Sequence, residues 1–250
     1  MKMFRFFLLA IFALIGASMD CYAQPGGNLI DAKGKKQGFW RKNYSDGIIR
    51  YEGNFKDDQP DGIFRYYTEE GVLKMVSYFY ENGTRSSVKV LDPKGTIISA
   101  GNYVGKQKDS TWTFYNEQKI VLSRETFNKG SLTGKTYVYY ENGQVSEEVT
   151  WVDNVRAGPW NQYFEDGKPR STATFVKGLL SGKMVFYHPN GKVKLTGTYM
   201  DDMKQGTWYS YAENGNLIST EVFKDGVSEN PNEFNFKKLD KPESEILKGP

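Results

Sequence analysis

Few side chains in this sequence have the chemistry that catalysis or metal binding requires. His188 is the only histidine among 250 residues, and Cys21 is the only cysteine. A zinc site of the usual kind, a Cys–His pair or a Ser–His–Asp triad would each have to be built around one of these two residues. We therefore predict no catalytic residue, no cofactor and no metal ligand, and we interpret His188 as an exposed turn residue.

Three glutamates recur at one position of a repeated turn, at Glu141, Glu165 and Glu213. We interpret them as solvated turn residues, and a ladder of carboxylates for cations is the alternative. Glycosidases need two carboxylates in a cleft, and the single-layer sheet that the repeat described below predicts offers no obvious cleft. The sequence also contains no phosphate-cradling loop and no long basic run. The chain is predicted not to be an enzyme.

The N-terminal segment has the three-part layout of a secretory signal peptide. Lys2 and Arg5 precede an apolar run over residues 6–17, and a more polar stretch ends in Cys-Tyr-Ala. Small residues at the −3 and −1 positions predict cleavage between Ala23 and Gln24. The apolar run is shorter than the roughly 20 residues that a permanent membrane span needs. We expect an exported protein, periplasmic or extracellular.

Cys21 leaves one alternative open, because a lipoprotein signal also ends at a cysteine. Such a signal wants a small residue just before the cysteine, whereas Asp20 stands there. We therefore favour cleavage after Ala23 over lipid attachment. The mature chain then has no cysteine, and it needs no disulfide.

The overall charge of the mature chain is close to zero. Removing Lys2, Arg5 and Asp20 lowers the basic count from 33 to 31 and the acidic count from 30 to 29, which leaves a net charge of +2. Nucleic-acid binders usually show a basic excess, so we predict no nucleic-acid partner. Aromatic residues make up 15% of the chain and glycine occurs 26 times, which favours strands and turns.

Residues 36–227 repeat themselves every 24 residues, eight times and without insertion. One column is aromatic in every copy: Phe55, Phe79, Tyr103, Phe127, Trp151, Phe175, Tyr199 and Phe223. At 15% aromatic content the chance of eight in eight is on the order of 10⁻⁷. A second column is glycine in seven copies: Gly47, Gly71, Gly95, Gly143, Gly167, Gly191 and Gly215. A third contains four tryptophans: Trp40, Trp112, Trp160 and Trp208.

Each unit reads as two short strands joined by a turn such as Asn142-Gly143, for which we predict type I′ geometry. The second strand alternates with a period of two. A small residue precedes the fully aromatic column by two positions in most units, and we predict that it leaves room for a ring from a neighbouring strand. Glu125, Val149 and Glu221 depart from this rule.

The pattern resembles the MORN repeat (membrane occupation and recognition nexus). Tyr51-Glu52-Gly53-Asn54-Phe55 followed by Gly62-Ile63-Phe64 is similar to its Tyr-x-Gly-x-aromatic core with a following Gly-x-aromatic. The 24-residue spacing is closer to a bacterial variant class whose members are often labelled antitoxin components. The resemblance implies an all-β fold, an elongated single-sheet array of eight stacked hairpins. It also implies a lipid-associated, scaffolding or toxin-neutralising role.

We divide the chain into a signal peptide (1–23), a linker (24–35), eight repeats (36–227) and a polar tail or C-terminal cap (228–250). In the tail, Phe234 and Phe236 are candidates for a capping strand. Units three and four are degenerate, which indicates either drift or a kinked or partner-facing stretch from Arg85 to Lys119.

Two function classes follow from these features. The first is an exported, non-catalytic scaffold that binds a protein partner, with immunity against a toxin as its sharpest form. The second is peripheral association with a lipid or envelope surface through aromatic and basic side chains, and the small net charge gives that class little electrostatic support.

Overall fold

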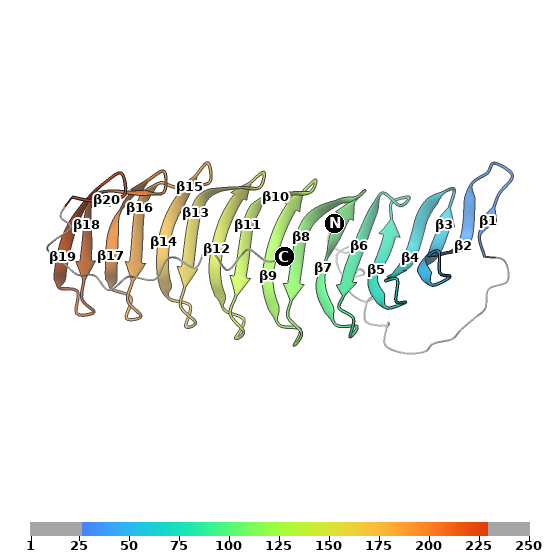
Figure 1. Ribbon diagram of the computed structural model, residues 1–250, viewed down its shortest axis with the longest axis horizontal. Coiled ribbons are helices and arrows are strands. Elements are labelled where there is room, and N and C mark those ends of the chain that lie inside the picture. Colours follow the sequence, from blue (N-terminus) through green and yellow to red (C-terminus); the bar gives the residue numbers. More distant parts are fainter. Residues whose placement is uncertain (1–26, 230–250) are drawn as a thin grey trace, which may run out of the picture.

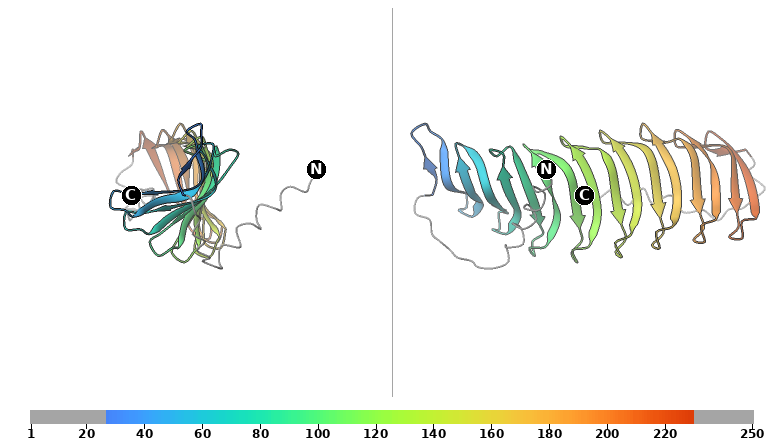
Figure 2. Two further views of the ribbon diagram at one scale, coloured as in Figure 1. Left: turned by 90° about the vertical axis from the view of Figure 1, so that its right-hand side faces the viewer. Right: turned by 180° about the vertical axis from the view of Figure 1, so that it is seen from behind.

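The computed structural model describes residues 27–229, which form one open antiparallel sheet without a helix (Figure 1). The strands run across the long axis of the molecule, and the sheet twists along that axis (Figure 2). The first ten strands are β1 (Leu29–Ile30), β2 (Lys36–Asn43), β3 (Ile49–Lys56), β4 (Gln59–Tyr67), β5 (Leu73–Tyr80), β6 (Arg85–Leu91), β7 (Ile97–Val104), β8 (Gln107–Tyr115), β9 (Val121–Asn128) and β10 (Ser131–Leu132). The other ten are β11 (Gly134–Tyr139), β12 (Val145–Val152), β13 (Val155–Tyr163), β14 (Pro169–Val176), β15 (Leu179–Leu180), β16 (Gly182–Tyr187), β17 (Val193–Met200), β18 (Met203–Tyr211), β19 (Leu217–Lys224) and β20 (Val227–Ser228).

The strands pair in sequence order, so the sheet is a continuous meander of hairpins. In two places the neighbouring strand is divided in two: β9 pairs with both β10 and β11, and β14 pairs with both β15 and β16. This arrangement confirms the predicted fold class, an all-β single sheet of stacked hairpins.

The predicted linker contains a short strand that the sequence did not reveal. β1 pairs with β2 along the first edge of the array. Asn28 holds it there, because its backbone N–H donates to Phe39 O and its side chain bonds both the backbone N–H and the carbonyl of Arg41. A strand of two residues is too short to show a periodic pattern, which explains why it was missed.

The turns inside the hairpins differ from the predicted type I′ geometry. At Asn142-Gly143 only the glycine has a positive φ, and the N–H of Gly143 donates to Tyr140 O. The register shifts by one residue in the adjacent strand pair. These features define a type I turn followed by a left-handed glycine in a G1 bulge. The other six glycines of this column adopt the same conformation, with φ between 80° and 92° across the set.

Type I′ turns occur instead between the hairpins. Asp57-Asp58, Asp153-Asn154 and Asp201-Asp202 each have two positive φ values and connect directly paired residues. These turns also bond to one another along the edge of the sheet. Asp202 Oδ1, for example, accepts from the N–H of Leu180 one unit earlier.

The degenerate third unit changes its entry turn without interrupting the sheet. β5 and β6 pair in regular register from Met75 to Tyr80, where other unit junctions have a bulge. A longer turn over residues 81–84 replaces the two-residue type I′ turn. The pairing continues through β7, β8 and β9, so this stretch is not a break in the array.

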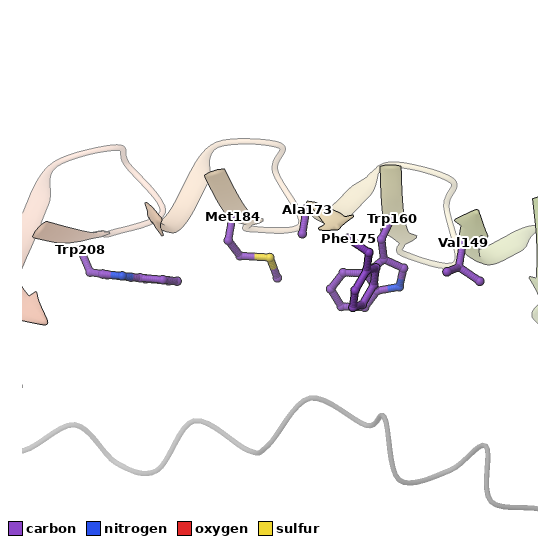
Figure 3. Packing of buried hydrophobic residues seen from close by; sticks show 6 residues of the cluster. All are labelled: Val149, Trp160, Ala173, Phe175, Met184 and Trp208. Atoms are coloured by element: carbon purple, nitrogen blue, oxygen red, sulfur yellow. The ribbon is translucent and has the colours of Figure 1, made fainter. Parts of the chain in front are cut away.

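Nearly all the buried side chains lie on one side of the sheet, which we call the aromatic face; Val185, on the opposite side, is the exception among the described residues. The column of Trp40 supplies most of them, and from the second unit to the eighth it is buried at Phe64, Val88, Trp112, Thr136, Trp160, Met184 and Trp208. Six members of the main cluster project from the same side of the sheet (Figure 3). The rings of the fully aromatic column flank them edge-to-face, as Tyr103 does against Trp112 at 5.1 Å and Tyr199 against Trp208 at 5.2 Å.

Glycines in the preceding strand let these rings lie directly on the backbone. A Cβ atom added at Gly53 would stand 2.5 Å from the Phe64 ring, and one at Gly101 or Gly197 would stand closer still to the indole of the next unit. The predicted role of the small residue is therefore confirmed at these glycines. Each glycine faces a ring because its strand pairs in register with the next unit.

The structure accounts for two of the three exceptions to the small-residue rule. Glu125 precedes the unit in which Thr136 replaces the aromatic ring, so its larger side chain has room. Glu221 lies in β19, after which no further hairpin follows within residues 27–229. Val149 stands directly opposite Trp160, and nothing in the structure explains why this position tolerates a valine.

The first prediction tests this pairing of a small residue with a ring. Thr136→Trp alone should destabilise the chain, because the new indole meets the Glu125 side chain. Adding Glu125→Gly should recover the loss, with a coupling energy of about 1–3 kcal/mol in a double-mutant cycle by urea denaturation. Glu221→Gly combined with Thr136→Trp is the matched control and should be additive. Additive effects of Thr136→Trp and Glu125→Gly would contradict a contact between the small-column residue and the ring of the next unit.

The second prediction concerns Lys119, which occupies a turn-glycine position with φ +64°. Non-glycine residues pay an energetic penalty in this region, so Lys119→Gly should raise the free energy of unfolding by about 0.5–1 kcal/mol. Gly143→Ala should lower it by about 1 kcal/mol, because alanine is strained where φ is positive. Equal midpoints of urea denaturation for Lys119→Gly and the parent chain would argue against backbone strain at this turn.

The third prediction concerns pH, because burial raises the pKa of Glu125 above its ordinary value, an effect that Lys108 partly opposes. The folded chain then holds this proton more tightly than the unfolded chain, so stability is lost as the pH rises through the folded-state pKa. Glu125→Gln should therefore raise the melting temperature at pH 7 and give no gain at pH 4. Glu141→Gln, at an exposed turn, should show no such difference between the two pH values.

Candidate functional site

The candidate residues that the sequence suggested lie apart from one another in the described part of the chain. No group of three or more His, Cys, Asp or Glu side chains in this range is placed to hold a metal ion. No helix of the described part of the chain is long and apolar enough to cross a membrane. Glu141, Glu165 and Glu213 lie exposed at the equivalent turn of three units. Cys21, Ala23 and Gln24 lie outside the described residues, as do Phe234 and Phe236.

His188 is half-buried rather than simply exposed, and it links two repeat units. Its Nε2 lies 2.8 Å from the carbonyl oxygen of Tyr211, so the ring N–H donates to that oxygen. Tyr44 and Tyr140, which occupy the same column, donate from their hydroxyls to the carbonyls of Tyr67 and Tyr163. The histidine therefore has a structural role that a tyrosine fills in two other units.

Cations lie over the tryptophans of the aromatic face. Lys36, Lys108 and Lys204 place Nζ between 4.5 and 5.0 Å from the ring centres of Trp40, Trp112 and Trp208. Arg156, in the same column, lies over Trp151 and Phe175. Such contacts are worth about 0.5–2 kcal/mol each. Burial lowers the pKa of Lys204, an effect that Glu221 partly opposes.

The sequence contained a signal for these contacts that went unused. The residue four positions before each tryptophan of the Trp40 column is basic. The equivalent residues before Phe64, Val88, Thr136 and Met184 are Pro60, Thr84, Leu132 and Leu180. A cation therefore appears only in units that contain a tryptophan in this column.

The opposite side of the sheet, which we call the polar face, is strongly basic. Face membership follows from the register, because residues paired across two strands share a face. Thirteen basic strand residues lie on it: Arg41, Arg50, Lys56, Arg65, Lys74, Arg85, Lys89, Arg124, Lys135, Arg170, Lys183, Lys194 and Lys224. Only four acidic strand residues share it: Glu52, Asp61, Asp109 and Glu148. Most of the remaining carboxylates lie in the turns along both edges, so the near-zero net charge conceals a separation of charge.

The two glutamates of the polar face are held by its cations. Glu52 Oε2 accepts from Nη2 of Arg41 at 2.9 Å and from Nε at 3.3 Å. Tyr67 donates its hydroxyl to Glu52 Oε1 at 2.9 Å. Burial first, and then this hydrogen bond, raise the pKa of Tyr67 to about 12. Glu148 pairs with Lys135, which raises the pKa of that lysine.

An apolar ridge runs along one edge of the polar face in the C-terminal units. It consists of residues that flank successive unit junctions and are 39–54% exposed: Val152, Val155, Val176, Leu179, Met200 and Met203. The equivalent positions in the first unit are Lys56 and Gln59. Six exposed apolar side chains at equivalent places on three consecutive junctions form a surface that water solvates poorly.

The structure places the sequence-predicted residues in two groups. The aromatic columns are half-buried or buried on the aromatic face, and the turn glycines lie along one edge. The basic polar face and the apolar ridge are the features that could bind a partner, and sequence reasoning identified neither of them.

Solved structures resemble the chain only weakly. A mutant of S. aureus TarM in complex with fondaparinux, alpha-GlcNAc-glycerol and UDP is 11% identical, with a TM-score of 0.31 over 48% of this chain and 21% of that chain. A second TarM structure gives 12% identity and a TM-score of 0.31 over 38% and 19% of the two chains. TcdB2-TccC3 gives 11% identity and a TM-score of 0.21 over 80% and 14%. The chain thus spans about a fifth or less of these chains, and the likeness carries no functional argument.

The C-terminal units match a known repeat family. A search of curated proteins found no match. The family described as the MORN repeat variant matches residues 132–153, 156–177, 180–201 and 204–225. The four segments begin 24 residues apart, and each ends where the structure turns into the next unit. Residues 132–225 are therefore four tandem MORN variant repeats, and they continue a sheet whose first four hairpins pair in the same way.

Proposed function

We propose that the chain is an exported, non-catalytic repeat scaffold that binds a protein partner along the polar face of its sheet. The observation that carries this proposal is the apolar ridge, which leaves valine, leucine and methionine side chains exposed at three consecutive unit junctions. Contiguous exposed apolar residues rimmed by polar ones are typical of interaction surfaces. Repeat arrays present such residues at regular intervals, which suits an extended partner.

Export rests on the sequence. Lys2 and Arg5, the apolar run over residues 6–17 and the small residues before Gln24 have the order of a cleaved signal peptide. The partner would then be met in the periplasm or outside the cell.

Immunity against a toxin is the sharper form of the proposal. It is supported by the resemblance of the 24-residue units to the bacterial MORN variant class, whose members are often labelled antitoxin components. An exported member would neutralise a toxin outside the cytoplasm. The partner in that case is a folded protein rather than a lipid surface.

Peripheral association with the envelope is the second candidate, because the same apolar ridge could enter a lipid headgroup layer. The charges beside the ridge argue against it. Asp153, Asp201 and Asp202 lie exposed at the turns between the ridge residues, and they outnumber the one cation there, Lys177. Anionic headgroups would be repelled by these carboxylates, so a protein partner is favoured.

The fourth prediction tests this choice by affinity capture. The full chain, tagged at its C-terminus and purified from its own envelope fraction, should start at Gln24 and retain one stoichiometric protein identified by mass spectrometry. Val176→Gln with Met200→Gln should lose that protein, because both changes remove apolar contact area from the ridge. Ile98→Gln with Leu122→Gln, at exposed apolar residues elsewhere on the polar face, should retain it.

Two results would count against the proposal. Recovery of lipid with no enriched protein would favour association with the envelope. Retention of the same protein by both double variants would show that the ridge is not the binding surface. A melting curve for each variant separates loss of binding from loss of fold.

A further inference from the structure

The N-terminal half of the polar face contains a cluster of basic side chains, which we call the basic patch: Arg41, Arg50, Arg65, Lys74 and Lys89. Arg41, Arg65 and Lys89 occupy one column of the repeat on β2, β4 and β6. Arg50 and Lys74 occupy a second column on β3 and β5. Arg41, Arg50, Arg65 and Lys74 are exposed to solvent.

The patch already shows which anion its geometry accepts. Glu52 lies opposite Arg41 on one side and opposite Arg65 on the other. Both Nε and Nη2 of Arg41 approach one of its carboxylate oxygens. Arginine matches a carboxylate well because its planar group offers several N–H donors in a fixed geometry. Arg65 presents the same group to solvent from the neighbouring strand.

The spacing of the columns favours an extended polypeptide over a polyphosphate. Equivalent residues of successive units are two strands apart, or roughly 9.6 Å at about 4.8 Å per strand. Three residues of a polyproline II chain advance by a similar length, at about 3.1 Å per residue, and complete one turn, so every third side chain faces the same way. An acidic side chain at every third residue would therefore meet one cation of a column per unit. A nucleic-acid strand carries a charge about every 3.4 Å along the duplex axis, which is too dense for this spacing.

Apolar side chains between the cations point to the same class of partner. Ile63 is 39% exposed and Tyr78 is 37% exposed on this part of the face. Protein interfaces are enriched in arginine and aromatic residues and combine them with apolar contacts. A surface that served only long-range attraction to phosphate would not need them.

We propose that the basic patch binds an extended acidic segment of the partner, with carboxylates at about every third residue, which lies across β2 to β6 along the long axis of the sheet. This inference rests on the proposed function in taking a protein as the occupant. It assigns to the N-terminal units a role in charge recognition that is separate from the apolar ridge of the C-terminal units.

The fifth prediction uses a fluorescein-labelled peptide with glutamate at every third position, titrated against the full mature chain by fluorescence anisotropy. Arg50→Glu, Arg65→Glu and Lys74→Glu together should weaken binding at least about tenfold, because three attractive contacts become repulsive. The matched control reverses three exposed turn lysines, Lys33, Lys106 and Lys177, and should change the affinity less than about twofold, since its net charge changes equally. Both variants should melt at the temperature of the parent chain.

Three results would overturn the inference. The first is equal binding by the patch variant and the turn variant. The second is equal binding of a peptide with the same composition but clustered glutamates, which would show that spacing is irrelevant. The third is tighter, patch-dependent binding of single-stranded DNA or of phosphatidylglycerol vesicles. Capture of the same partner by the patch variant would contradict this inference but not the proposed function. Patch-dependent peptide binding without any captured protein would contradict the proposed function but not the charge recognition.

Discussion

The structure depends on one steric constraint, which is that a single-layer sheet has no second layer to cover its buried residues. Burial is achieved by laying a large ring flat on the backbone of the preceding strand. Phe64, Trp112 and Trp208 do this over glycines and become almost fully buried. Each unit therefore gains its core from the unit before it. Stability is then approximately a sum of neighbour terms, as in other repeat arrays.

This constraint explains where the repeat tolerates variation. Outside the pair of Val149 with Trp160, a residue in the small column is restricted mainly by the ring of the next unit, so Glu125 is accommodated where Thr136 follows. In the column of Lys36, a cation is present only in units with a tryptophan in the Trp40 column, as with Lys108 over Trp112. The degenerate third unit changes its turn while its strands stay paired, because backbone hydrogen bonds do not depend on these side chains.

The fold was predictable because every unit meets the same kind of neighbour, which makes a 24-residue period visible in one sequence. The turn types were not, since Asn142-Gly143 fits both a type I′ turn and a type I turn with a following glycine. The two differ in the sign of φ at the asparagine, which the strand register decides. The pairing of Lys36 with Trp40 was readable in principle. Side chains alternate between faces along a strand, so residues four positions apart lie on the same face.

The candidate surfaces were not predicted for a different reason: composition does not distinguish the two faces of the sheet. A chain with a net charge near +2 has little overall attraction for an anion, yet alternation along each strand places most of its strand cations on one face, and the turns contain most of its carboxylates. Screening in physiological salt limits charge effects to about 8 Å. A partner on the polar face therefore experiences the local cations of the basic patch far more than the acidic turns at the edges. For a single-layer sheet, the charge of each face determines what it binds, and the total charge does not.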